Sequence, residues 1–129
     1  MYKYYKELRN IHFRLTLKEK RKKLNILGMD ANLMCMVEIA YQVRNSVHYL
    51  VASQQTEPGY GWPYADILKT LTTDSSISPA DFAKSIVQSY ADYYGTGFDL
   101  DTSVTLSAID VSWIDEATLA FNALLALLF

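Results

Sequence analysis

Apolar side chains recur at steps of three and four positions over the first residues of the chain. This period predicts an amphipathic helix over residues 3–21. The positions of its apolar face are Tyr4, Tyr5, Leu8, Ile11 and Leu15. Lysine and arginine dominate residues 18–23, and such positive charge favours the C-terminal end of a helix.

The pattern then changes to short apolar runs on either side of one amphipathic segment. Residues 24–29 and 48–53 are mostly apolar, as buried parallel strands are. Residues 33–44 predict a helix between the two strands. Its apolar face consists of Leu33, Met36, Val37, Ala40, Tyr41 and Val43. A strand, a helix and a strand in so short a stretch predict a right-handed βαβ unit.

Turn-forming residues and helix caps divide the second half of the chain. The predicted elements are a loop over residues 57–64, a short helix over 64–72, a helix over 78–94, a strand over 103–110 and a last helix over 112–129. Ser78 at the N-cap and Pro79 at the first helical position mark the start of the helix over 78–94, and Gly95 marks its end. Ser112, with acids three and four residues later, opens the last helix. The fold class is therefore α/β.

Length and composition fit one domain without a cofactor. The chain has 129 residues, of which 50% are hydrophobic and 20% charged, and this balance argues against disorder. The single cysteine, Cys35, rules out an intrachain disulfide and a cysteine-based zinc site. The two histidines, His12 and His48, are too far apart in the sequence to suggest a metal site. We therefore expect no cofactor.

The charge is concentrated at the N-terminus. Residues 1–23 contain nine of the twelve Lys and Arg residues, and only Glu7 and Glu19 as acids. A basic segment with interleaved tyrosines is compatible with nucleic-acid binding. The alternative is a solvated helix face, and the helical spacing of the aromatic residues favours it. We therefore expect no nucleic-acid partner.

Nothing in the sequence indicates a leader or a membrane. The N-terminus is charged but lacks the apolar centre of a signal peptide. The most apolar run, residues 124–129, is far too short to span a bilayer. We expect a soluble chain without a membrane partner, and its localisation stays open.

Polar residues follow the two strands of the predicted βαβ unit. Asp30 and Asn32 follow the first strand, Ser53 follows the second, and the loop over residues 57–64 comes soon after. Ligands of open parallel sheets bind at the carboxyl ends of the strands. A strand-to-helix junction at this edge also offers unpaired N–H groups and a partial positive charge, which stabilise a thiolate or an oxyanion.

The sequence at this junction follows a known pattern. Residues 28–41 read GMDANLMCMVEIAY. They resemble the nucleophile segment of the clostripain family of cysteine peptidases, in which a strand ending in Asp-Ala-Cys-Leu-Met precedes a helix containing Val-Glu-Val-Ala-Tyr. Further counterparts of family motifs are found at residues 49–53, 57–64, 78–79 and 105–110, so the resemblance extends over residues 22–128.

The resemblance implies a caspase-like three-layer sandwich and a Cys–His dyad that cleaves after Arg or Lys. In such a dyad the thiolate attacks the scissile carbonyl and the histidine protonates the leaving amine. Of the family's sheet of about six strands, this chain supplies about three mostly parallel strands, flanked by four to five helices. Residues 1–129 are thus one partial domain, in which the basic helix of residues 1–23 leads into the first strand. Members of the family are often secreted or located at the cell envelope.

Three features depart from the family pattern. Asn32 occupies the place of the nucleophilic cysteine, and a carboxamide is no nucleophile here, although asparagine is a good helix N-cap. The His-Gly motif of the preceding strand is missing, since His12 lies in the predicted N-terminal helix and His48 begins the second strand. Tyr60 stands where many relatives carry an acid that helps to select a basic P1 residue.

The resemblance also assigns candidate substrate contacts. Asp30 matches the family and either attracts a cationic side chain or caps backbone amides of a loop, and we weigh the two equally. Trp62 and Tyr64 either line a substrate cleft or pin the loop to the sheet. The predicted substrate-binding set consists of Asp30, Ser53, Tyr60 and Trp62.

Cys35 is the only candidate for a substitute nucleophile. It lies three residues after Asn32, in the predicted first helical turn, where a helix dipole would lower its pKa. We favour the alternative of a small buried core residue, because its side chain is expected to point along the helix flank.

The missing strands leave the edge of residues 24–29 open. The chain is a fragment of a longer protein, a processed heavy chain whose partner is the missing N-terminal half (a light chain), or a degenerate protein that forms a homodimer; Met1 favours a start codon at this point. The leading functional hypothesis is a clostripain-like peptidase fragment, inactive as it stands, from a family acting on substrates with a basic P1 residue. The alternative is a pseudo-peptidase that binds basic peptides through Asp30 and the loop around Trp62 or regulates an active relative.

Overall fold

A mixed three-stranded sheet lies at the centre of the protein. The computed structural model describes residues 22–96 and 103–128, so the predicted helix over residues 3–21 lies outside the described part. The strands are β1 (Leu24–Met29), β2 (Val47–Ala52) and β3 (Ser107–Asp110), arranged in the order β1-β2-β3. The helices are α2 (Val37–Val43), α3 (Tyr64–Thr73), α4 (Pro79–Thr96) and α5 (Ile114–Leu128), with a 3-10 turn η1 (Val111–Trp113) before the last of them.

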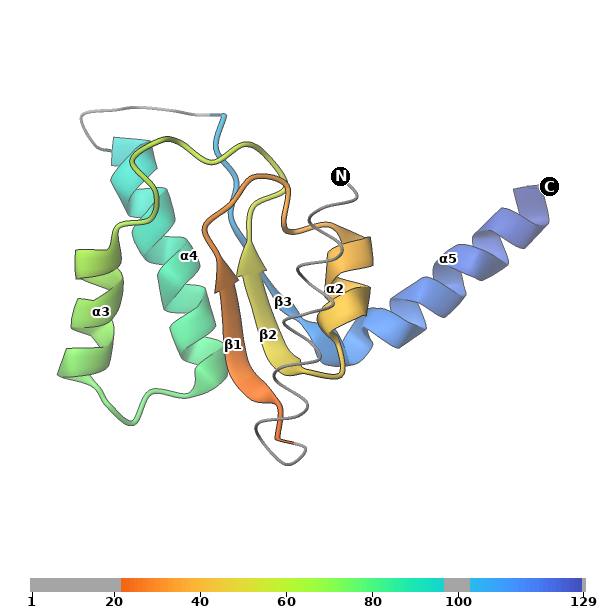
Figure 1. Ribbon diagram of the computed structural model, residues 1–129, viewed down its shortest axis with the longest axis horizontal. Coiled ribbons are helices and arrows are strands. Elements are labelled where there is room, and N and C mark those ends of the chain that lie inside the picture. The colour runs from red at the N-terminus through yellow and green to blue at the C-terminus, as the bar shows by residue number, and fades with distance from the viewer. Residues whose placement is uncertain (1–21, 97–102, 129) are drawn as a thin grey trace.

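Helices cover both faces of this sheet. Figure 1 shows α3 and α4 on one side of the strands, and α2 with the start of α5 on the other. The predicted α/β sandwich is therefore confirmed, with four α-helices in the described residues.

The direction of the strands follows from their connections. β1 and β2 are parallel and joined through α2, which confirms the predicted βαβ unit. β3 runs antiparallel to β2, with Ser107 opposite Ala52 and Asp110 opposite Tyr49. The sheet thus has one parallel and one antiparallel pair. The start of β3 lies beside the end of β2, which brings the segment before β3 to the carboxyl end of the parallel pair.

β2 is the only strand of the described chain with fully buried residues on both faces. Leu50 packs in the cluster with α2 and the start of α5, whereas Val51 packs in the cluster with α3 and α4. The first cluster contains Cys35, Ile39, Ala40, Val43, Val47, Leu50, Ala52, Val111 and Ile114. The second contains Val51, Trp62, Ile67, Ala83, Ile86, Tyr90 and Tyr94. Both helical layers therefore depend on β2 for their contact with the sheet.

The start of α2 differs from the prediction. The helix begins at Val37, and its N-cap Met36 has an extended backbone without a side-chain cap. Leu33, predicted as the first helical residue, adopts a left-handed conformation with φ of 61°. Its N–H group donates to the carbonyl of Gln55 at 3.0 Å. Pairing with the segment after β2 therefore takes precedence over helix formation in residues 33–36.

Local capping explains the remaining boundaries. Ser78 accepts a hydrogen bond from the N–H of Asp81 at 3.1 Å, which confirms the predicted N-cap of α4. Gly95 does not end this helix, because α4 continues to Thr96. β3 begins only at Ser107, later than the predicted residue 103. The N–H of Ser112 donates to the carboxylate of Asp110 at 3.0 Å, so Asp110 caps η1, and α5 begins after it, not at Ser112.

α5 leaves the body of the protein soon after it begins. Arg44 at the end of α2 forms an ion pair of 2.8 Å with Asp115, and its guanidinium lies over the ring of Tyr41. Beyond this point the helix extends away from the other elements (Figure 1). Its exposed large apolar side chains are Leu119, Phe121, Leu124, Leu125, Leu127 and Leu128.

The apolar stretch at this end is longer than the predicted run of residues 124–129. By length and composition alone, Val111–Leu128 is long and apolar enough to cross a membrane, with a mean hydropathy of 1.4. A single such helix is weak evidence for a membrane span, because core helices of soluble proteins meet the same criterion.

We predict that the core around β2 determines stability. Leu50→Ala removes a fully buried side chain and should lower the free energy of unfolding by about 2–5 kcal/mol. Leu68→Ala, the matched control, removes a leucine of α3 that is 55% exposed, and its effect should stay within about 0.5 kcal/mol. Urea denaturation of both variants measures the difference. Equal losses in the two variants would contradict the assignment of the core.

Candidate functional site

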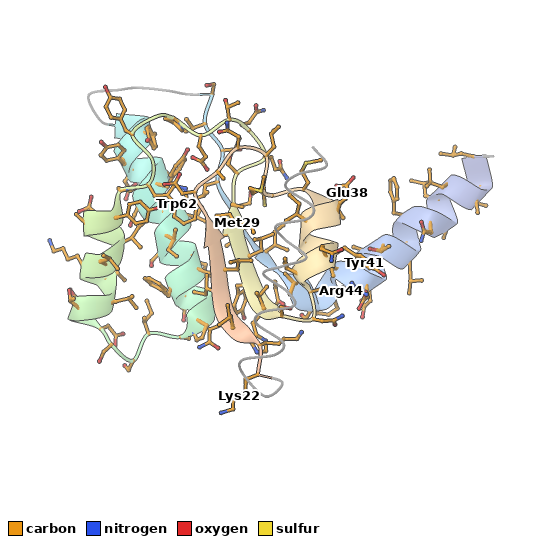
Figure 2. All side chains as sticks on the ribbon, viewed as in Figure 1. Lys22, Met29, Glu38, Tyr41, Arg44 and Trp62 are labelled. Atoms are coloured by element: carbon orange, nitrogen blue, oxygen red, sulfur yellow. The ribbon has the colours of Figure 1, made fainter. Side chains whose placement is uncertain are left out.

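Two segments lie side by side at the carboxyl end of the parallel strands. The turn over residues 30–36 follows β1, and the loop over residues 53–63 follows β2. In Figure 2, Met29 at the end of β1 and Trp62 of the loop mark this region. The ends of β1 and β2, where the sequence predicted the site, therefore lie next to each other.

Backbone hydrogen bonds join the turn to the loop. The N–H of Cys35 donates to the carbonyl of Ser53 at 2.8 Å, and the N–H of Leu33 donates to the carbonyl of Gln55 at 3.0 Å. The side chain of Asn32 adds a third contact, because its Oδ1 accepts from the N–H of Glu57 at 2.6 Å. The prediction that Asn32 is a helix N-cap is therefore wrong, because α2 begins at Val37 and Met36 is its N-cap. Asn32 holds the loop after β2, because the chain turns back before α2 begins.

Asp30 is bonded to the same loop. Its Oδ2 accepts from the N–H of Trp62 at 3.1 Å and from the hydroxyl of Tyr64 at 2.8 Å. The side chain remains exposed to solvent. The interpretation of Asp30 as a cap of loop amides is confirmed, and its predicted role toward a cationic side chain stays a prediction.

The close approach of the loop to Asp30 requires glycine. Gly61 has a φ of +69°, and an added Cβ would lie 2.7 Å from Oδ2 of Asp30. A side chain there would meet both backbone strain and a collision with the carboxylate. Gly61 therefore permits the bond between Asp30 and the N–H of Trp62.

Glu57 is the central residue of the loop, although it was not among the residues predicted for the site. Its two carboxylate oxygens accept from Tyr90 Oη at 2.8 Å and from Trp62 Nε1 at 3.4 Å. One turn further along α4, the hydroxyl of Tyr94 donates to the carbonyl of Gly61 at 2.7 Å. In the sequence, the spacing of these two tyrosines, four residues apart on one predicted helix, is the feature that could have indicated a contact with the loop.

Burial raises the pKa of the Glu57 carboxyl above its ordinary value of 4.5, and the nearby charge of Asp30 acts in the same direction. The hydrogen bonds from Tyr90 and Trp62 oppose this shift. Desolvation also raises the pKa of the Tyr64 hydroxyl to about 12, with further contributions from Asp30 and Glu57. Burial and the hydrogen bond to Glu57 raise the pKa of the Tyr90 hydroxyl as well. Tyr64 and Tyr90 therefore stay protonated near neutral pH and donate to Asp30 and Glu57.

The aromatic residues of the loop differ in accessibility. Trp62 is 7% exposed, and its ring packs against Gly28 of β1, where an added Cβ would lie 3.0 Å from the indole. Its indole thus pins the loop to the sheet. Tyr60 is 76% exposed, whereas the ring of Tyr64 stacks beside Trp62 at 6.3 Å.

Ser53 lies inside the protein. It is fully buried, and its hydroxyl lies 3.1 Å from the hydroxyl of Thr105 and accepts from the N–H of Gln55 at 2.9 Å. The bond to Thr105 connects the end of β2 to the segment before β3. Because Ser53 is fully buried, its position does not support the predicted contact with a substrate.

Cys35 is a core residue. It is 2% exposed, precedes the first residue of α2 and belongs to the cluster under that helix. Burial raises the pKa of its thiol, and a hydrogen bond with Ser107 lowers it to a smaller extent. The prediction that a helix dipole lowers the pKa of Cys35 was wrong, because the residue lies before the start of α2 and its pKa is raised by burial. The favoured interpretation as a small buried residue is confirmed.

No histidine of the described residues lies near Asn32. His48, the one histidine in the described ranges, is the second residue of β2 and lies at the end of the sheet opposite Asn32. His12 lies outside these ranges. The described residues also contain no group of three or more His, Cys, Asp or Glu side chains that could hold a metal ion.

Comparison with known proteins gives one family. The model of the clostripain family, Peptidase_C11, matches residues 5–129. A search of the curated proteins found no match.

Solved structures of peptidases share the fold. A cysteine protease of B. fragilis superposes with a TM-score of 0.67 at 25% identity, covering 84% of this chain and 45% of its own. A clostripain from Bacteroides thetaiotaomicron, in complex with the peptide inhibitor BTN-VLTK-AOMK, gives 0.61 at 26%, covering 79% and 44%. A secreted C11 cysteine protease from the same species, iotapain, gives 0.60 at 26%, covering 73% and 25%. The chain therefore spans less than half the length of each of these proteins.

We predict a measurable pH dependence from Glu57. Because its pKa is raised in the folded state, the folded protein keeps this proton to higher pH than the unfolded chain. Stability therefore falls as pH rises from about 4.5 through the folded pKa. Glu57→Gln keeps an acceptor for Tyr90 but does not titrate, so its free energy of unfolding should fall less over this interval.

Urea denaturation at several pH values measures this difference, with Glu116→Gln on the exposed start of α5 as the matched control. The carboxyls of Asp74, Asp81 and Asp110, whose pKa values are lowered by hydrogen bonds, titrate in all three proteins and cancel in the comparison. Parallel pH profiles for wild type and Glu57→Gln would refute the role of Glu57.

Proposed function

The chain belongs to the clostripain family of peptidases. We propose that it is the nucleophile-side part of a peptidase domain and that it does not hydrolyse peptides by itself. The observation that carries the proposal is the state of Asn32. By the resemblance, this residue occupies the place of the catalytic cysteine. Its carboxamide has no nucleophilic group and accepts a hydrogen bond from the Glu57 N–H.

No other side chain in the described part of the chain takes over the chemistry. Cysteine attacks as the thiolate, and Cys35 is buried with a raised thiol pKa, both of which oppose attack on a peptide. General acid catalysis requires a proton donor within reach of the leaving group. His48 lies at the opposite end of β2 and does not meet this condition.

Recognition of a basic side chain is the property that the site retains. Asp30 presents an exposed carboxylate at the carboxyl end of β1, and the Glu57 carboxylate adds to the negative field there. Two neighbouring carboxylates attract an arginine or lysine side chain. The inhibitor bound to the B. thetaiotaomicron clostripain contains the peptide VLTK, which ends in lysine. Tyr60 does not supply the additional acid that the resemblance leads one to expect.

Two functions are compatible with these properties. A fragment of an active enzyme would regain hydrolysis when joined to a part that supplies a histidine and a cysteine. A pseudo-peptidase would bind basic peptides without cleaving them, or regulate an active relative. The buried Cys35 and the hydrogen-bonded Asn32 favour binding without turnover for the chain as it stands.

We predict that the purified chain binds an arginine-containing peptide and does not cleave it. Fluorescence anisotropy measures binding, and a fluorogenic version of the same peptide measures turnover. Asp30→Asn should weaken binding by about tenfold, since it removes one close charge interaction, whereas Asp66→Asn on the exposed start of α3 should leave it unchanged. A peptide with citrulline in place of arginine should not bind.

Turnover by the purified chain that disappears in Cys35→Ala would overturn the proposed inactivity. Equal binding of the arginine and citrulline peptides would overturn recognition of a basic residue by this site.

We further infer that the missing part of the domain covers two surfaces of the chain. One is the free edge of β1, which pairs only with β2 among the described strands. The other is the apolar surface of α5, on which Asn122 is the single polar residue between Leu119 and Leu128. A helix that is apolar on all sides requires burial. Since the structural relatives contain more than twice the matched length, the remaining half of such a domain is the partner that fits both surfaces.

The exposed helix should therefore make the isolated chain self-associate. Phe121→Glu combined with Leu124→Lys places charges on α5 and should shift the protein toward monomer in sedimentation velocity, with lower binding of a hydrophobic dye. Leu68→Glu on α3 is the matched control, because Leu68 and Leu124 are similarly exposed at 55% and 52%. A wild-type protein that is monomeric and binds no dye would argue against an unsatisfied surface on α5.

A further inference from the structure

We propose that Asn32 is a positioning residue, whose carboxamide locks the loop after β2 onto the end of β1 and so holds Asp30 in a fixed geometry for a cationic ligand. The ligand rests on the function proposed above. The lock itself is a feature of the hydrogen bonds of this chain and is tested separately.

The side chain of Asn32 extends a ladder of backbone hydrogen bonds. Two contacts are made by main-chain N–H groups, from Cys35 to Ser53 at 2.8 Å and from Leu33 to Gln55 at 3.0 Å. Two residues after Gln55, the N–H of Glu57 donates to Oδ1 of Asn32 at 2.6 Å. The carboxamide oxygen therefore takes the part of a main-chain carbonyl at the position where the turn moves away from the loop.

The contact also closes a ring of interactions that returns to Asp30. Glu57 is bonded to Asn32 through its backbone and to the indole of Trp62 through its side chain, at 3.4 Å. The N–H of Trp62 donates to Asp30 at 3.1 Å, and Asp30 lies two residues before Asn32. Tyr90 of α4 fixes Glu57 from the core side at 2.8 Å. A shift of Glu57 would thus be transmitted through Trp62 to the carboxylate of Asp30.

Cysteine at this position could not form the same lock. A carboxamide oxygen is a strong acceptor with two lone pairs, whereas a thiol sulfur is a weak acceptor on a side chain shorter by one atom. By the resemblance, Asn32 replaces a cysteine. The substitution that removes the nucleophile therefore adds a hydrogen bond to the loop, and it uses an N–H group that a thiol would leave without this partner.

The backbone next to Asn32 gives the lock a further role. Leu33 has a positive φ of 61°, which is unfavourable for a branched side chain, and its side chain is exposed. Burial of the Leu33 side chain therefore does not compensate for the strain. Two hydrogen bonds hold the turn in this conformation: Oδ1 of Asn32 accepts from the N–H of Glu57, and the N–H of Leu33 donates to the carbonyl of Gln55.

Amide hydrogen exchange of Glu57 tests the lock directly. Asn32→Asp keeps an oxygen acceptor at the same position, whereas Asn32→Leu has a similar volume and no acceptor. We expect the Glu57 N–H to exchange about threefold to tenfold faster in Asn32→Leu than in wild type, from the loss of one hydrogen bond. Asn32→Asp should retain the slow exchange. Asn45→Leu, in the exposed turn after α2, is the matched control and should not change it.

Peptide binding tests whether Asn32 acts through Asp30. Asn32→Leu should weaken the affinity for the arginine peptide by about threefold to tenfold, if the loss of order is passed on to Asp30. In the Asp30→Asn background the same substitution should have no further effect, because the residue that it positions is gone. Additive effects of the two substitutions would overturn the positioning role.

The two measurements separate the lock from the proposed function. Equal exchange of the Glu57 N–H in wild type and Asn32→Leu overturns the lock, whatever the peptide does. Faster exchange in Asn32→Leu, together with no peptide binding by wild type, supports the lock and overturns the proposed recognition of basic peptides.

Discussion

Strand β2 is buried on both faces, and the helical layers on either side of the sheet pack against it. Leu50 joins the sheet to α2 and the start of α5, and the neighbouring Val51 joins it to α3 and α4. Because successive side chains of a strand point to opposite faces, a shift of one residue would exchange the two sets. The register of β2 thus fixes the height at which its carboxyl end meets that of β1, and it determines where Asp30 and the loop after β2 come together.

At this end of the sheet, hydrogen bonds hold the loop after β2 in place. The loop is fixed from three directions, by Asn32 and Asp30 of the turn after β1, by Trp62 against Gly28, and by Tyr90 of α4. In an active cysteine peptidase the nucleophile needs a side chain that is free to react. Asn32 is instead engaged with its own loop, an arrangement that favours a rigid binding surface over a reactive group.

The described residues are closely packed around β2 and leave two surfaces uncovered. These two surfaces, the edge of β1 and the apolar helix α5, are both features that soluble proteins ordinarily cover. Arg44 and Asp115 attach the first turn of α5 to α2, and among the described residues no contact of the remaining helix explains its composition. Both surfaces agree with a chain that spans less than half the length of its structural relatives.

The fold class, the βαβ unit, the cap at Ser78 and the family could be predicted from the sequence, because periodicity, caps and linked motifs are local properties that need few distant contacts. Three features could be seen only in the folded protein: Asn32 bonds to Glu57, Cys35 lies outside α2, and Glu57 connects α4 to the loop. These outcomes depend on which segments meet at the end of the sheet. Residues 33–36 have the composition of a helix, but the hydrogen bonds to the segment after β2 outweigh that local preference, and no local pattern records such a competition.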